Sequence, residues 1–106
     1  MADEMVVLIT AGSEDEAAKI ARALVDDRLA ACVNILPGIR SLFFWDNKVQ
    51  DEREVLMICK TRQPLIEKII KRVKELHSYT VPEIIALPIA AGSAEYLGWV
   101  RETTGE

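Results

Sequence analysis

The sequence is poor in the residues that most metal sites and catalytic sites need. Among its 106 residues there are one histidine, His77, and two cysteines, Cys32 and Cys59. Two cysteines are too few for a disulfide framework, and the absence of Cys-x-x-Cys and His-x-x-x-His spacings disfavours a metal site within one chain. With one imidazole available as a base and neither cysteine at a predicted helix N-terminus, the sequence predicts that the protein is not an enzyme.

Glycine-rich loops and long apolar runs are also missing. The five glycines are scattered, so no loop that cradles phosphate is predicted. The longest apolar runs, such as residues 84–91, are far too short to span a bilayer, and residues 1–5 are acidic where a signal peptide would be basic. We therefore expect a cytoplasmic protein with no membrane partner, whose cysteines stay reduced.

The charge balance excludes another class of partner. Thirteen basic residues stand against seventeen acidic ones, a net charge of −4, and the two signs are interleaved along the chain. A surface that tracks phosphates is not expected, so we predict no nucleic-acid partner. Half of the residues are hydrophobic, which is enough for one domain over residues 1–106 to build a core that needs no metal or cofactor to fold.

What the sequence does contain is an alternation of strand-like and helix-like segments. Strands are predicted over residues 5–10, 31–45, 48–61 and 83–88, and helices over 14–27, 63–76 and after 93. Ser13 and Glu16 are spaced as a capping box, in which Glu16 reaches back to the amide of the cap residue. The almost wholly apolar first strand is expected to be covered on both faces.

This order predicts an α+β fold of the ferredoxin-like kind. It is a four-stranded antiparallel βαββαβ sheet with two helices on one face, to which the last helix is added. Asp46-Asn47 is a tight turn between two strands of about twice the usual length. The second strand would lie at a sheet edge and carry Leu42-Phe43-Phe44-Trp45, an aggregation hazard unless another chain covers it, so a closed oligomer is predicted.

Two readings of the aromatic residues Phe43, Phe44 and Trp45 are open: a platform for stacking bases and a packed subunit interface. Stacking platforms come with basic grooves, whereas the residues across the turn are mainly acidic, so an interface is favoured.

A two-residue turn also fixes the register of the long hairpin. The residue numbers of each opposed pair then sum to 93. This places Cys59 opposite Asn34 and Cys32 opposite Thr61, with both thiols on one face of the sheet. A bulge at Pro37-Gly38 would shift this register.

The segment that contains the one histidine, His77, is a candidate site. Lys60, Tyr79 and Glu83 could gather near His77 at one end of the sheet, although solvated surface positions are favoured for most of them. For His77 itself, complementing the end of a helix is the favoured alternative.

Several segments together resemble one known family. They are residues 29–35, 37–41 with Trp45, 60–61, 77–84 and 96–99, that is LAACVNI, PGIRS, KT, HSYTVPEI and YLGW. Across essentially the whole chain the sequence is similar to the CutA family of divalent-cation tolerance proteins. The resemblance implies a ferredoxin-like protomer, a homotrimer assembled through the long hairpin, copper binding and a role in tolerance to copper and other divalent ions.

The resemblance to the metal site proposed for that family is incomplete. Some members carry a cysteine where Ile9 stands here and a further histidine where Leu76 stands, so only His77 carries over. The metal ligands that we expect are therefore His77, Cys32 and Glu83, brought together in clefts between subunits to bind copper or another divalent cation.

Three other functions are weighed against this one. The family is similar in architecture to the PII signalling proteins, so a small-molecule sensor is one alternative, although the turn at 46–47 leaves no room for their long signalling loop. A plain scaffold trimer is a second. An acylphosphatase-like enzyme is disfavoured because Thr10-Ala11-Gly12-Ser13 offers no arginine for a phosphate loop.

Overall fold

The structure is a computed structural model that describes residues 3–105. Its elements follow in the order β1 (Glu4–Ala11), α1 (Glu14–Asp26), β2 (Cys32–Trp45), β3 (Lys48–Arg62), a 3-10 turn η1 (Gln63–Leu65), α2 (Ile66–Leu76), β4 (Ile84–Pro88) and α3 (Ala94–Thr104). This confirms the predicted βαββαβ order with an added C-terminal helix. The element boundaries differ from the predicted ones by at most one residue, except that α2 begins three residues later than predicted, after the 3-10 turn.

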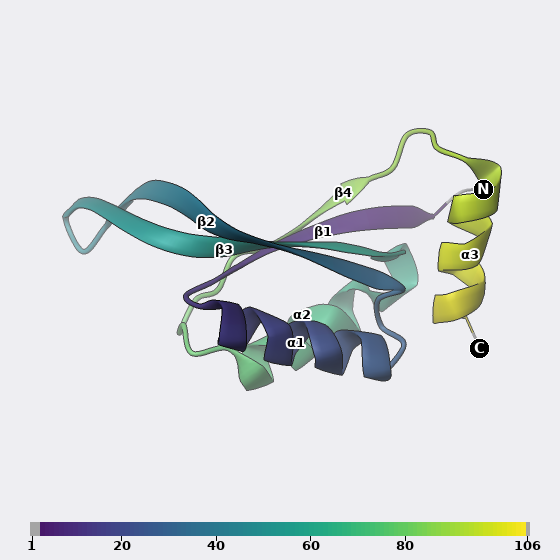
Figure 1. Ribbon diagram of the computed structural model, residues 1–106, viewed down its shortest axis with the longest axis horizontal. Helices are drawn as coiled ribbons and strands as arrows, with labels where there is room; N and C mark the ends of the chain where they lie inside the picture. Colours follow the sequence, from purple (N-terminus) through teal and green to yellow (C-terminus); the bar gives the residue numbers. More distant parts are fainter. Residues whose placement is uncertain (1–2, 106) are drawn as a thin grey trace.

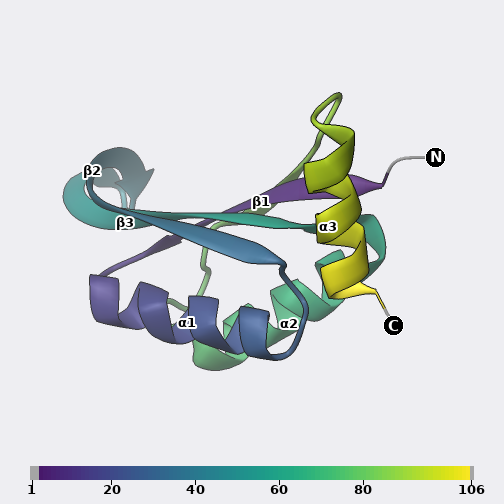
Figure 2. The same cartoon turned by 45° about the vertical axis from the view of Figure 1, so that its right-hand side comes forward.

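The four strands form one antiparallel sheet in the order β2-β3-β1-β4. Helices α1 and α2 cover one face, while α3 stands at the end of the sheet opposite the long hairpin (Figure 1, Figure 2). The hairpin formed by β2 and β3 extends well beyond the helices, and the molecule measures 44 × 25 × 22 Å. Strand β2 lies at a sheet edge, as predicted, and β4 forms the other edge.

The helical face of the sheet holds the core. Ala17, Ile20, Ala21 and Leu24 of α1 are buried at helical spacing, as the sequence predicts. They pack with the rest of one cluster, which comprises Val7, Ile9, Ala11, Ala30, Val55, Met57, Cys59, Leu65, Ile69 and Val73. Each fully buried aliphatic side chain of this kind stabilises the fold by about 1.5–3 kcal/mol relative to exposure.

The opposite face is open over most of its length. We expected β1 to be covered on both faces, and this is wrong: Val7 and Ile9 are fully buried, but Val6 and Leu8 are only half-buried. Helices α1 and α2 belong to crossover connections on the same side of the sheet, so no helical layer covers the second face. By register, its apolar residues, here named the open sheet face, are Val6, Leu8, Leu36, Leu56, Ile58, Ile85 and Leu87.

A bulge in β2 corrects the predicted register. From the turn as far as Ile39, the residue numbers of each opposed pair sum to 93. The register then shifts between Leu36 and Ile39. Cys32 therefore opposes Lys60, and Cys59 opposes Val33. Because a one-residue shift reverses the faces, the prediction that the two thiols share a face is wrong.

The two thiols consequently have different surroundings. Cys59 is buried in the core, where loss of solvent raises the pKa of its thiol to about 12. Cys32 is half-buried on the other side, beside Tyr96 of α3, and burial and this thiol raise the pKa of Tyr96. The environment of Cys59 therefore does not favour a reactive thiolate.

The hairpin turn has the geometry that the sequence predicts. Asp46 and Asn47 take φ values of 55° and 63°, the pair of positive values that suits a two-residue hairpin turn. Phe44 and Trp45 just before it are 69% and 57% exposed, which confirms that the tip leaves the core.

Among residues 3–105, no helix combines the length and apolar character that crossing a membrane requires.

The bulge depends on Gly38, whose φ of 77° is left-handed. A Cβ there would meet no atom within 4 Å, so a substitution acts through backbone strain alone. We expect Gly38→Ala to lower the free energy of unfolding by about 1 kcal/mol, measured by denaturant titration. Gly38→Asn, which tolerates this conformation, serves as the control and should lose less. Equal stability of Gly38→Ala and the parent would contradict this account of the bulge.

Candidate functional site

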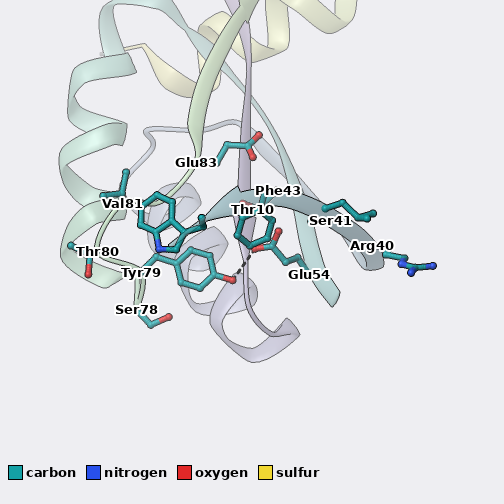
Figure 3. A pocket seen from close by; sticks show the side chains of 12 residues that line it. Thr10, Arg40, Ser41, Phe43, Glu54, Ser78, Tyr79, Thr80, Val81 and Glu83 are labelled. Atoms are coloured by element: carbon teal, nitrogen blue, oxygen red, sulfur yellow. Dashed lines mark hydrogen bonds between the residues drawn. The ribbon is translucent and has the colours of Figure 1, made fainter. Parts of the chain in front are cut away.

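A cavity of about 840 Å³ lies between the hairpin and the segment that follows α2 (Figure 3). It is lined by Thr10, Arg40, Ser41, Leu42, Phe43, Trp45, Glu54, Ser78, Tyr79, Thr80, Val81 and Glu83. Its volume falls within the range of small-molecule sites in proteins, roughly 300–1,000 Å³. We name it the hairpin cavity.

The strand alternation beyond the bulge decides which hairpin side chains reach the cavity. Because Ile39 opposes Glu54, alternation places Phe43 and Trp45 on the same side as Glu54, and Phe44 on the opposite side. Phe43 and Trp45 line the cavity, whereas Phe44 does not. The three aromatic residues predicted as one interface are thus divided between the two sides of the ribbon.

Glu54 and Tyr79 join the two walls of the cavity. The Tyr79 hydroxyl donates to Glu54 Oε2 at 2.8 Å, and the two side chains point toward one another in Figure 3. Burial, together with the hydrogen bond to this carboxylate, raises the pKa of the Tyr79 phenol. Tyr79 therefore stays protonated at neutral pH and holds its ring at a fixed place in the wall.

His77 fixes the segment on which Tyr79 lies. Its buried ring donates from Nε2 to the carbonyl of Thr10 at 2.7 Å, and its Nδ1 accepts from the amide of Tyr79 at 3.0 Å. The ring centroid lies 4.6 Å from that of Tyr79. His77 does follow α2, as its C-cap, but its ring bonds to β1 and to its own turn rather than to the end of the helix. Both ring nitrogens are therefore already used.

Glu16 ties the same segment to the start of α1. Its Oε2 accepts from the amide of Ser78 at 2.7 Å, and its Oε1 accepts from the amide of Gly12 at 3.2 Å. Burial alone would raise the pKa of this carboxyl, but the hydrogen bonds from Ser78 and Gly12 outweigh it, so the pKa of Glu16 is lowered. The capping box is therefore altered: Ser13 caps the amide of Glu16 as predicted, but Glu16 bonds to Gly12 and not to the cap residue.

The expected metal ligands do not lie together in one protomer. Glu83 is exposed and lines the cavity, whereas the buried His77 is not part of its lining. Cys32 pairs with Lys60, which in turn pairs with Val6, so Cys32 lies at the level of Val6 of β1. His77 bonds to Thr10, four residues further along that strand. At about 3.3 Å per residue, roughly 13 Å separates the two positions along the strand. Across the part of the chain that the structure describes, no group of three or more histidine, cysteine or acidic residues is placed to hold a metal ion.

Only part of this site is predictable from the sequence. Tyr79 and Glu83 do lie near His77, but Lys60 does not join them and bonds to Asn34 instead. Glu54 and Glu16 were missed as members of the site. Glu54 could have been found by extending the hairpin register beyond the bulge, whereas the bond of Glu16 to a residue 62 positions away leaves no local signal.

Comparison with known proteins gives a consistent result. The model of the family described as CutA1 divalent ion tolerance protein matches residues 5–103. The divalent-cation tolerance protein CutA of Thermus thermophilus is 56% identical over 102 residues, which cover 96% of this chain and 99% of that protein. The crystal structure of CutA1 from Oryza sativa superposes with a TM-score of 0.95 at 42% identity, covering 98% of this chain and 95% of that one.

A longer relative is also similar. The chloroplastic protein CutA of Arabidopsis thaliana is 47% identical over 100 residues, which are 94% of this chain and 55% of the relative. The chain thus spans nearly all of the bacterial relative and about half the length of the plant one.

The Glu16 hydrogen bonds predict a specific loss of stability. Glu16→Ala leaves the amides of Ser78 and Gly12 without their acceptor, so we expect the free energy of unfolding to fall by about 1–3 kcal/mol at pH ~7. Because the folded state lowers the pKa of Glu16, the stabilisation is complete above the ordinary value near 4.5 and is lost as the pH falls through the lowered value. Denaturant titrations at pH ~7 and pH ~3 should therefore show the difference from the parent shrinking in acid.

The matched control is Glu14→Ala, which removes a carboxylate from the same first turn of α1 at an exposed position. It should cost at most a few tenths of a kcal/mol, about the value of an exposed charge at a helix end. Equal losses for Glu14→Ala and Glu16→Ala would show that the bond to Ser78 contributes nothing.

Proposed function

The chain belongs to the CutA1 divalent ion tolerance protein family, and from this premise we propose that it acts as a homotrimer that binds soft or borderline metal ions weakly between its subunits. The exposed hairpin is the single observation that carries the assembly. The proposed role is one of binding rather than catalysis, because Cys59 is buried with its thiol pKa raised and both nitrogens of His77 are engaged.

Two apolar surfaces support the assembly. Phe44 and Val49 are more than 60% exposed on the side of the hairpin that faces away from the cavity, and Leu42 is exposed to the same extent. The open sheet face adds Leu36, Ile85 and Leu87, each about half exposed. Apolar surface of this extent on an edge strand promotes aggregation unless identical chains cover it in a closed arrangement.

The proposed metal ligands are Cys32, Glu83 and His77, contributed by different subunits. Within one protomer Cys32 lies roughly 13 Å along the strand from the level of His77, so their convergence requires two chains. The half-buried Cys32 thiol suits Cu(I), and the exposed Glu83 suits a borderline divalent ion. His77 can join only by giving up its bond to Thr10, which supports weak rather than tight binding.

The state of the cysteines supports a reducing compartment, and we propose the cytoplasm. Cys32 and Cys59 are both free thiols and face opposite sides of the sheet, so they cannot pair without rearrangement.

A second candidate is a trimer that binds a small molecule. The hairpin cavity favours it, because its volume of about 840 Å³ far exceeds what a single metal ion needs.

The assembly is tested by sedimentation equilibrium. We expect the parent to have three times the 11.9 kDa mass of the chain. Phe44→Glu places a charge in the proposed contact and should lower this mass or the solubility of the protein. Ala18→Glu, which adds the same charge to the exposed side of α1, should leave the parent mass unchanged. A soluble parent at the mass of one chain would refute the assembly and the shared metal site together.

The metal site is tested by calorimetric titration with Cu(I) under reducing conditions. We expect Cys32→Ser to weaken binding by about tenfold, the effect of losing one of a few ligands. Cys59→Ala removes the buried thiol and should preserve the affinity. Absence of heat with the parent, or an unchanged affinity in the double variant Cys32→Ala and His77→Ala, would overturn the proposed ligands.

A further inference from the structure

The hairpin cavity combines aromatic and acidic walls. Phe43 and Trp45 come from the hairpin and Tyr79 from the segment after α2, so three aromatic side chains contribute to its lining. Glu54 and Glu83 supply carboxylates to the same lining. A shallower depression beside it shares the three aromatic residues and adds Glu52 and Asp46.

Glu54 has an unused acceptor at this cavity. It is only 8% exposed, and its carboxylate accepts the Tyr79 hydroxyl through Oε2. Among the described residues no donor is found for Oε1. Because Oε1 keeps contact with solvent, a donor or a positive charge that enters the cavity can reach this carboxylate.

The nearby basic groups do not neutralise Glu54. Arg40 donates to both carboxylate oxygens of Asp51, at 2.9 and 2.7 Å, and its guanidinium points away from Tyr79 in Figure 3. Lys48 lines the shallower depression next to the turn and not the cavity itself. The cavity therefore keeps an excess of negative charge.

The chemistry of the lining selects one class of ligand. Anions are disfavoured by Glu54 and Glu83, and a neutral apolar ligand would offer no donor to Glu54 Oε1. A bare metal ion finds no third ligand in this part of the described chain. An organic cation interacts favourably with both the acidic and the aromatic part of the lining, because its charge is attracted to carboxylates and to the faces of tryptophan, tyrosine and phenylalanine.

We propose that the hairpin cavity binds a small organic cation of the alkylammonium class, held by the faces of Phe43, Trp45 and Tyr79 and by the carboxylate of Glu54. The wall is rigid before the ligand arrives, because Tyr79 is held through its hydroxyl by Glu54 and through its amide by His77. Gly12 contributes by its lack of a side chain, since a Cβ there would lie 3.3 Å from the Tyr79 hydroxyl. Such preorganisation reduces the entropy lost on binding.

This site goes beyond the proposed metal function and names the ligand class for the second candidate function, on which it rests. It does not use Cys32, and His77 serves it only through the bond of its Nδ1 to the amide of Tyr79. It lies on the same side of the sheet as the open sheet face, so a sister chain in the trimer would border it.

The test uses the full-length assembled protein, kept free of metal by a chelator, and the probe is tetramethylammonium chloride. Binding is followed through the indole resonance of Trp45 and tryptophan fluorescence, with sodium chloride at equal ionic strength as the blank. We expect saturable shifts at millimolar concentrations, and much weaker ones with tert-butanol, a neutral molecule of similar shape.

Three variants then localise the site. Glu54→Gln keeps an acceptor for Tyr79 but removes the charge, and should weaken binding about tenfold. In Trp45→Leu the chemical shifts of the Tyr79 ring should report a similar loss. Phe44→Leu, on the opposite side of the ribbon, is the matched control and should bind like the parent. Sedimentation of each variant shows that the assembly is intact.

The outcomes separate this proposal from the metal function. If the parent shows no saturation up to ~100 mM probe, binds tert-butanol equally well, or loses no affinity in Glu54→Gln, the organic-cation site is refuted. That result leaves the Cu(I) titration and Cys32 untouched. Conversely, saturable binding that depends on Glu54 supports the site even if the protein takes up no copper.

Discussion

The left-handed backbone at Gly38 determines the direction in which each side chain of the hairpin faces. Its bulge shifts the register by one residue, and in a strand one residue reverses the two faces. Below the bulge, Cys32 is thereby directed away from the core that holds Cys59. Beyond it, Phe43 and Trp45 are placed on the side of Glu54, where the cavity forms. A single glycine thus couples the arrangement of the thiols to the lining of the cavity.

The second constraint is the anchoring of the segment after α2. Glu16 holds it to the start of α1, and His77 holds it to the end of β1. These hydrogen bonds join three parts of the chain that are far apart in sequence, and they need no metal. The one histidine of the protein is therefore accounted for as a structural residue that positions Tyr79, while the groups left accessible at the cavity are aromatic rings and carboxylates.

The sequence predicted those features that depend on neighbouring residues. The order of the strands and helices, the Ser13 cap and the positive φ values of Asp46 and Asn47 each follow from residues within one turn or one period, and the structure confirms them. Features set by distant contacts were predicted poorly. The bulge could be named as a possibility at Pro37-Gly38, but its effect on register depends on pairing with β3, and the partners of Glu16 and Glu54 lie 62 and 25 residues away.

The pairing of β4 with β1 has a consequence for the newly synthesised chain. Its ladder joins the two ends of the sequence, whereas the β2–β3 ladder grows from a two-residue turn. Since the entropy lost on closing a loop rises with its length, the hairpin is the tertiary contact that forms at the lowest cost, and its residues also leave the ribosome before β4. The newly synthesised chain therefore exposes its apolar hairpin to association with other chains before β4 has paired with β1.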